Sequence, residues 1–210
     1  MRNAKLESIA RKYYDASLPY HNFNHVLKAV EAGMHVVERC RSKGVPLDEV
    51  IVYCAILFHD AGFREDPSRH GFASKEEYAA RIAADELVRL GYTPDLVLRV
   101  QEAIVGTQRD AKVGTGTNEL KAVRAADLAQ LAETYPVFRA NAIALLREEE
   151  LLGGTRIPWE DWKKRILPTL EYYLSQNLYL TTDPGADPEA QDFHVRARRN
   201  IKMLRDDPGP

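Results

Sequence analysis

Residues 50–60 read Val-Ile-Val-Tyr-Cys-Ala-Ile-Leu-Phe-His-Asp, and this stretch decides much of the expected fold. Nine mostly apolar residues in succession predict a helix that is buried on all sides. His59 and Asp60 close the stretch, and either side chain is costly to bury without a partner. A metal ion bound by both residues would remove that cost.

Two other segments supply candidate partners for this pair. Residues 20–25 read Tyr-His-Asn-Phe-Asn-His, and residues 125–128 read Ala-Ala-Asp-Leu. In a helix, Asp127 shares a face with Leu120, Val123 and Leu131, so we expect its carboxylate to be buried. A buried carboxylate needs a cation or several donors, and the alternative to a metal ion is an ion pair with an arginine such as Arg124.

Length and composition set broad limits. The chain has 210 residues, of which 45% are hydrophobic, and this predicts one domain over 1–210 with a core over about 20–180. A formal net charge of −2 gives no overall attraction to polymeric nucleic acid, although a local basic pocket could hold a phosphate. Cys40 and Cys54 form no CxxC pair, so neither a disulfide framework nor a thiolate metal site is indicated. With no export signal and no long apolar run, we expect a cytoplasmic protein without a membrane span.

The apolar residues recur with helical spacing along almost the whole chain, which predicts an all-α bundle. Asn22 is the expected N-cap of a helix that runs to Arg41. Pro46 or Leu47 should begin the helix that carries His59 and Asp60. Ser74 and Glu77 have the spacing of a capping box. Further helices are expected at about 94–108, 118–133, 136–152 and 158–176, and a basic one at 191–204.

The order of these motifs resembles the HD-domain superfamily of metal-dependent phosphohydrolases. The group in question carries Tyr-His-Asn-x-x-His, then Phe-His-Asp, then a late Asp-Leu. The matching residues here are Tyr20, His21, Asn22, His25, Phe58, His59, Asp60, Asp127 and Leu128. The resemblance implies a single-domain HD-type helical bundle with His25, His59, Asp60 and Asp127 as metal ligands.

Two imidazoles and two carboxylates suit one divalent transition ion, namely Mn, Fe, Co, Ni or Zn. Open coordination positions would let water and a phosphate oxygen bind together. The resemblance implies that the activity is hydrolysis of a small phosphomonoester or nucleotide. Glu76 and Glu77 are the candidates for proton transfer, with capping as the alternative role. The candidate substrate-binding residues are His21, Asn22, Arg64, Thr107 and Arg147, with a solvated surface position as the alternative for each arginine.

Departures from the family pattern keep a second reading open. Related sequences place a histidine soon after the residue equivalent to Thr107, but Gln108-Arg109-Asp110 follows here, so a second metal ion is not expected. Mononuclear HD nucleotidases often carry a glutamate where this chain has Phe63. The alternative is therefore a regulatory or ligand-binding HD module that keeps the metal without turnover. A di-iron oxygenase is disfavoured because its extra histidines are absent. The sequence leaves the oligomeric state open.

Overall fold

The computed structural model describes residues 2–109, 111, 116–176 and 187–210. Every regular element in these ranges is a helix and none is a strand, so the all-α prediction is confirmed. The chain divides into two compact units, Met1–Asp127 and Leu128–Pro210. One domain over 1–210 with a core over 20–180 stays a prediction, and residues 177–180 lie outside the described part. No described helix is long and apolar enough to cross a membrane.

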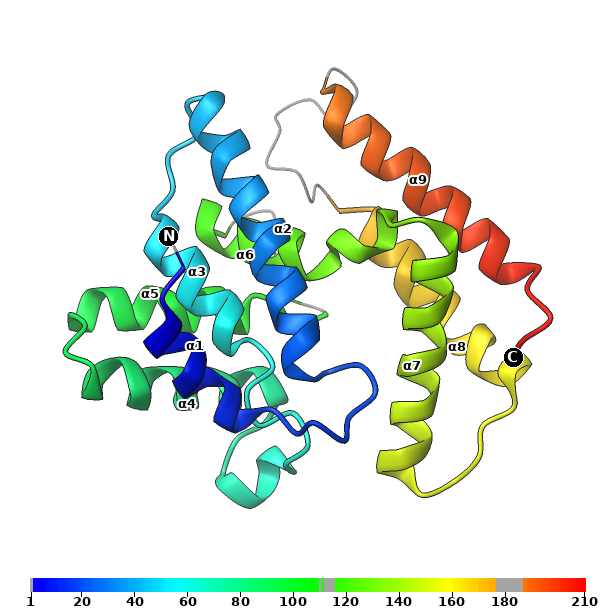
Figure 1. Ribbon diagram of the computed structural model, residues 1–210, viewed down its shortest axis with the longest axis horizontal. Helices are drawn as coiled ribbons and strands as arrows, with labels where there is room; N and C mark the ends of the chain where they lie inside the picture. The colour runs from blue at the N-terminus through cyan, green and yellow to red at the C-terminus, as the bar shows by residue number, and fades with distance from the viewer. Residues whose placement is uncertain (1, 110, 112–115, 177–186) are drawn as a thin grey trace. The chain divides into compact units, whose positions relative to one another are not determined.

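The first unit holds the elements from the N-terminus to α6 (Figure 1). They are α1 (Ala4–Ala10), η1 (Arg11–Tyr13), α2 (Phe23–Ser42), α3 (Glu49–Phe58), η2 (Pro67–His70), α4 (Lys75–Arg89), α5 (Pro94–Val105) and α6 (Asn118–Asp127).

Helix α3 is the centre of this unit. It packs against α1, α2, α4, α5 and α6, and every residue from Ile51 to Phe58 is buried. This position explains why the run shows no polar face from Ile51 onward, because no side of the helix meets solvent there. Val50, predicted to be buried with the rest, is exposed at the start of the helix. Full burial of a large apolar side chain such as Phe58 stabilises the fold by about 1.5–3 kcal/mol. The C-terminal end of α3 is therefore fixed by packing, and with it the backbone of His59 and Asp60.

The caps agree with the sequence at two helices and differ at a third. The side chain of Asn22 accepts hydrogen bonds from the backbone N–H groups of Asn24 and His25, which confirms the predicted N-cap. Ser74 caps α4, and the Glu77 carboxylate accepts a hydrogen bond from the backbone N–H of Ala73. The helix expected to begin at Pro46 or Leu47 begins at Glu49, because Asp48 caps it instead.

The second unit is built from η4 (Leu128–Ala132), α7 (Tyr135–Gly153), α8 (Trp159–Leu174) and α9 (Pro188–Arg205). Its core includes Phe138, Trp162, Phe193 and Leu204. The amide of Asn200 on α9 donates to the backbone carbonyls of Leu131 and Glu133 at 2.9 and 2.7 Å. These two bonds fix the end of η4 against α9.

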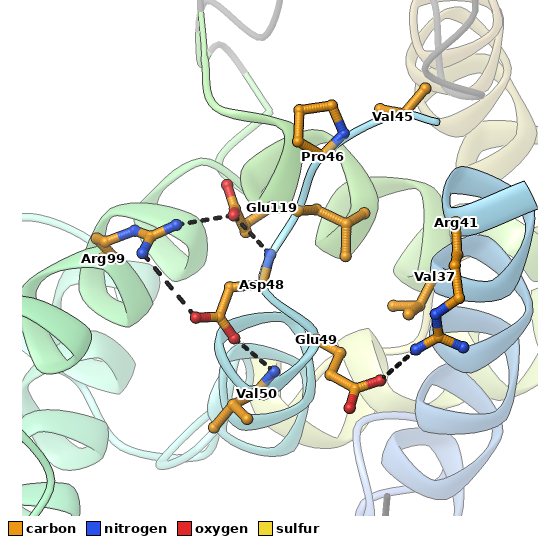
Figure 2. Close-up of a pocket in the computed structure, with 10 residues that line it drawn as sticks. Val37, Arg41, Val45, Pro46, Asp48, Glu49, Val50, Arg99 and Glu119 are labelled. Carbon is orange, nitrogen blue, oxygen red and sulfur yellow. Dashed lines mark hydrogen bonds and ion pairs between the residues drawn. The ribbon is translucent and has the colours of Figure 1, made fainter. Parts of the chain in front are cut away.

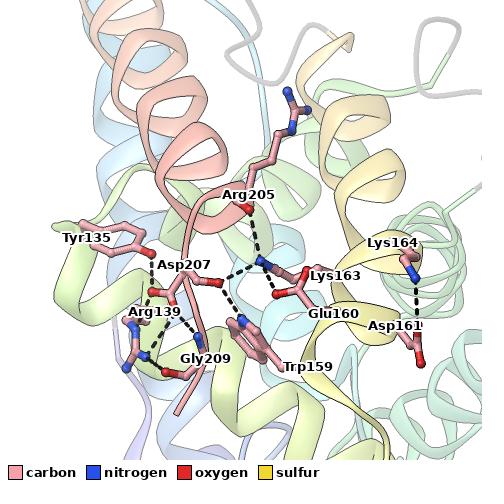
Figure 3. Close-up of polar contacts among 10 residues, drawn as sticks. All are labelled: Tyr135, Arg139, Trp159, Glu160, Asp161, Lys163, Lys164, Arg205, Asp207 and Gly209. Carbon is pink, nitrogen blue, oxygen red and sulfur yellow. Dashed lines mark hydrogen bonds and ion pairs between the residues drawn. The ribbon is translucent and has the colours of Figure 1, made fainter.

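A buried carboxylate, that of Asp207, ties the residues after α9 to α7 (Figure 3). It accepts hydrogen bonds from the Tyr135 hydroxyl at 2.7 Å and from the Arg139 guanidinium at 2.6 Å. On the α8 side, Trp159 and Lys163 donate to the backbone carbonyl of Asp207. Asp207 therefore connects the segment after α9 to both α7 and α8.

Replacing Asp207 with asparagine is expected to destabilise the second unit by about 2 kcal/mol at neutral pH. The hydrogen bond from Arg139 lowers the pKa of Asp207 from 3.8 to about 2. This stabilisation is complete above the unfolded-state pKa and is lost as the pH falls from about 4 to about 2. Trp159 and Trp162, the only tryptophans in the chain, make urea unfolding of this unit measurable by fluorescence. A D207N variant that is as stable as the wild type at pH 7 would contradict the expectation.

Candidate metal centre

Three helix ends bring the predicted ligands together in the first unit. His25 lies in the first turn of α2, His59 directly follows α3, and Asp127 is the last residue of α6. One ligand atom from each of these three residues lies within 4.8 Å of the other two. The fourth predicted ligand, Asp60, follows His59 in the same turn.

The distances among the four side chains fit a shared cation. Asp60 Oδ2 lies 2.9 Å from His59 Nε2 and 3.5 Å from His25 Nε2. Asp127 Oδ1 lies 3.4 and 3.3 Å from the same two nitrogens. Adjacent ligands of an ion with bonds of about 2.1 Å are separated by about 3.0 Å in an octahedron and about 3.4 Å in a tetrahedron. The donor set therefore matches a transition ion in both chemistry and spacing.

Three of these ligand atoms are buried and make no hydrogen bond within the described part of the chain. They are His25 Nε2, His59 Nε2 and Asp60 Oδ2. Buried polar atoms in folded proteins almost always have a partner, because leaving one unsatisfied costs about 1–3 kcal/mol. A cation bound at this point would satisfy all three atoms together.

A backbone contact sets the orientation of the His59 ring. Its Nδ1 lies 2.8 Å from the carbonyl oxygen of Ile56. A carbonyl only accepts, so Nδ1 carries a proton and donates it, while Nε2 faces the carboxylates. This arrangement is typical of metal-bound histidines, whose second nitrogen is held by a hydrogen bond.

The electrostatics of the cluster favour a positive charge. Burial opposes a charged imidazole at His59, but Asp60 and Asp127 outweigh it and raise the His59 pKa well above its ordinary value. Burial likewise opposes the charged form of Asp60, but His59 and His21 lower the Asp60 pKa. The two carboxylates thus create a negative potential between the imidazoles, which either a proton or a metal cation can neutralise.

The environment of Asp127 corrects one expectation. Its side chain is 28% exposed and so is only half-buried, because α6 ends at this residue where the sequence predicts a helix to residue 133. The nearby Arg124 is fully buried and donates to the backbone carbonyls of Gly106, Gln108 and Arg109. Arg124 therefore holds the turn after α5, while Asp127 faces the two histidines.

A glycine inside α2 allows the three ligand-bearing helices to approach one another. A Cβ atom on Gly33 would lie 2.2 Å from Ile56 Cδ1 on α3 and 3.3 Å from Ala126 Cβ on α6. Ile56 is three residues before His59, and Ala126 is next to Asp127. Glycine in a helix interior costs about 1 kcal/mol relative to alanine, and the close packing explains its presence.

Substituting leucine for Gly33 should weaken metal binding by about tenfold while the helices still form. The added side chain must separate α2 from α3 and α6, which moves His25 away from His59 and Asp127, and such overpacking also costs about 1–3 kcal/mol of stability. Titration with Co²⁺, read by its visible absorption, measures the affinity, and circular dichroism measures the helix content. Gly153→Leu is the control, because a Cβ at Gly153 would meet only Thr155 Oγ1 at 3.9 Å. Equal Co²⁺ affinity in both variants would show that close packing at Gly33 does not position the ligands.

Several of the other predicted site residues have structural partners. Asn22 caps α2 and also donates to the carbonyl of Leu18. Glu77 caps α4, and the Thr107 hydroxyl donates to the carbonyl of Ile104. Arg64 donates to Asp15 and Ser17 at 2.6 Å each. Substrate contact or catalysis by these side chains stays a prediction.

The remaining predicted residues differ in where they lie. Arg147 is exposed on α7, in the second unit. Glu76 is half-buried in the first turn of α4. The His21 ring stacks on Phe63 and lies 5.9 Å from the His25 ring, measured between ring centres. The His21 ring therefore lies beside the ligand cluster, whereas the Asn22 side chain is linked to it through the backbone N–H of His25.

A separate pocket of about 710 Å³ lies at the start of α3 (Figure 2). Its two arginines are both paired with carboxylates: Arg99 with Glu119 at 2.8 Å and with Asp48 at 4.0 Å, and Arg41 with Glu49. The lining holds three carboxylates in all, Asp48, Glu49 and Glu119, so negative charge is in excess. Because both arginines are already paired and carboxylates outnumber them, the pocket offers little attraction for an anionic substrate. Its ion pairs instead fix the N-terminus of α3.

Sequence reasoning missed the residues that connect α4 to the ligand cluster. The Lys75 ammonium donates to the carbonyl of Phe63 at 2.7 Å and lies 3.5 Å from the centre of the Phe63 ring. The Gln108 amide donates to the Ser74 hydroxyl at 2.7 Å. The family pattern marks Phe63 only as a position where related proteins often carry glutamate. Nothing in the spacing of Lys75 or Gln108 indicates these contacts.

Comparison with known proteins identifies no family for this chain. No protein-family model matches it, and no curated protein matches it.

Proposed function

We propose that this protein is a metal-dependent hydrolase of a small phosphomonoester or nucleotide. The observation that carries the proposal is the convergence of His25 Nε2, His59 Nε2 and Asp60 Oδ2, all buried and all without a hydrogen bond to the residues that the structure describes. Asp127 adds a second carboxylate that is partly open to solvent. The resemblance of the motifs to the HD-domain superfamily supports the choice of phosphate esters as substrates.

The ligand set accounts for the proposed metal. Two imidazoles with two carboxylates favour Mn, Fe, Co, Ni or Zn over Mg and Ca, which prefer oxygen ligands alone. The two negative charges would balance a single divalent ion. When bound, such an ion would activate a water molecule as nucleophile and polarise the phosphoryl group.

The chain's own residues would then orient the substrate and move protons. His21 lies beside the ligands and can donate a hydrogen bond to a phosphate oxygen. Glu76 is on the first turn of α4, and its neighbour Lys75 contacts Phe63, three residues after Asp60. This places the first turn of α4 next to the loop that carries Asp60. We assign proton transfer to Glu76, because Glu77 is engaged in capping.

The proposal is tested by loading the purified chain with one equivalent of Mn²⁺, Co²⁺, Ni²⁺ or Zn²⁺ and measuring phosphate release. The panel contains nucleoside monophosphates, nucleoside triphosphates and sugar phosphates. We expect release that depends on the metal and disappears in Asp127→Asn. If the fully loaded chain hydrolyses none of these esters, a metal-containing binding module becomes the better description.

A further inference from the structure

The rings of His21 and Phe63 form a stack that ends at Lys75. The His21 and Phe63 ring centres are 3.7 Å apart with an angle of 16° between the planes. The Lys75 ammonium lies 3.5 Å from the centre of the Phe63 ring. Two groups cannot share one ring face at these distances, so His21 and Lys75 cover opposite faces of Phe63.

Phe63 in the middle of the stack is held by its ring and by its backbone. Lys75 donates to the carbonyl oxygen of Phe63 as well as lying over its ring, so one side chain holds both the backbone and the ring. The ammonium–ring attraction contributes to this hold because the face of an aromatic ring carries negative potential. The backbone N–H of Phe63 also donates to the carbonyl of Asp60 at 3.1 Å. Phe63 is thereby attached both to α4 and to the ligand-bearing turn.

The far end of the stack meets the ligand cluster. The His21 ring lies 4.7 Å from the Tyr20 ring and 5.9 Å from the His25 ring, centre to centre. His21 belongs to the loop before α2, where backbone contacts alone would leave its side chain several rotamers. The stack on Phe63 favours one of them, together with the edge-on contact of the Tyr20 ring.

We infer that Phe63 and Lys75 are positioning residues that hold the His21 imidazole beside the metal centre, where it binds a phosphate oxygen of the substrate. This inference rests on the proposed function for the identity of the ligand. It assigns a role to Phe63, which the family pattern marks only as the place of a missing glutamate, and to Lys75, which no motif marks. Neither residue contacts the substrate itself.

The test measures how tightly the Zn²⁺-loaded chain binds inorganic phosphate, using isothermal titration calorimetry. His21→Ala should weaken phosphate binding by about tenfold, and Phe63→Leu and Lys75→Met by about as much, because they act through His21; residues that orient metal ligands cost about 10–100-fold when lost. Phe63→Tyr keeps the aromatic ring and Lys75→Arg keeps the positive charge, so these two variants should bind phosphate nearly as tightly as the wild type. Phe72→Leu and Lys202→Met are matched controls outside the stack and should bind phosphate as the wild type does.

Double variants separate positioning from a general structural effect. If Phe63 and Lys75 act through His21, then Phe63→Leu and Lys75→Met should cause no further loss of phosphate affinity in the His21→Ala background. Independent roles would instead give losses that multiply. In NMR spectra, Phe63→Leu should remove the upfield ring-current shift of the His21 ring protons while leaving Zn²⁺ affinity unchanged.

The outcomes distinguish this inference from the proposed hydrolase activity. Multiplying losses, an unchanged His21 spectrum in Phe63→Leu, or failure of the Zn²⁺-loaded chain to bind phosphate would each overturn the inference. If phosphate binds and the losses do not multiply, but no ester in the panel is hydrolysed, the positioning role stands and the hydrolase proposal fails.

Discussion

His59→Ala is expected to reduce metal affinity by more than about a hundredfold. The wild-type chain is expected to bind one divalent ion. The variant removes a buried donor and leaves Asp60 Oδ2 and His25 Nε2 facing a gap where the imidazole stood. Loss of residues that only orient ligands costs about 10–100-fold in metal affinity, so loss of a ligand should cost at least the upper value. Elemental analysis after purification and a competitive titration with a chelating dye give the stoichiometry and the affinity.

The control for this experiment is His35→Ala. His35 lies on α2, the helix that carries His25, and is exposed, so its removal should leave the metal content unchanged. Two equivalents of metal per wild-type chain would contradict the single-ion expectation. Retention of one equivalent in His59→Ala with unchanged affinity would show that the ion binds elsewhere.

The main helices could be predicted because their signals are local. The apolar run of α3, the Asn22 cap of α2 and the Ser74 cap of α4 each depend on a few neighbouring residues. Local signals do not depend on how helices pack, so they can be identified from one sequence. The start of α3 was placed two or three residues early because Pro46 and Leu47 are suitable helix starters and Asp48 is the better cap.

The convergence of His25, His59, Asp60 and Asp127 could be predicted from their motifs, but the packing that produces it could not. Gly33 looks like an unfavourable residue in the middle of α2, and only the positions of Ile56 and Ala126 explain it. The end of α6 at Asp127 also escaped prediction, since the apolar spacing continues through Leu128 and Leu131. Those two residues belong to the core of the second unit, so the same pattern serves two compact units.

The supporting contacts around the site are the least predictable part. Lys75 and Phe63 are separated by twelve residues, and Gln108 and Ser74 by thirty-four. The first contact depends on how the loop after Asp60 folds back onto α4, and the second on how the turn after α5 meets the start of α4. Ser74 and Lys75 attach the first turn of α4 to two neighbouring segments. Glu76 follows Lys75 in this turn, so its backbone is held on a rigid element. A proton-transfer group needs this kind of placement, within hydrogen-bond reach of the atom it serves.

Glu76→Gln should therefore lower phosphate release by about a hundredfold or more while the chain keeps its metal ion. The amide has nearly the shape of the carboxylate but cannot take up a proton at neutral pH, and general acid–base catalysis typically contributes about 10²–10⁴-fold to the rate. The loss should fall on kcat rather than on KM, because the ground-state contacts of the substrate persist. Metal content and kcat are measured on the same preparation, with whichever ester the panel identifies.

Glu77→Gln is the matched control, since glutamine can still accept the hydrogen bond from the backbone N–H of Ala73 and preserve the cap. It should retain most of the activity and all of the metal. A large fall in kcat in Glu77→Gln with none in Glu76→Gln would move the proton-transfer role to Glu77. No fall in either variant would leave solvent as the proton acceptor, because the metal and the phosphate-binding residues would then be sufficient for turnover.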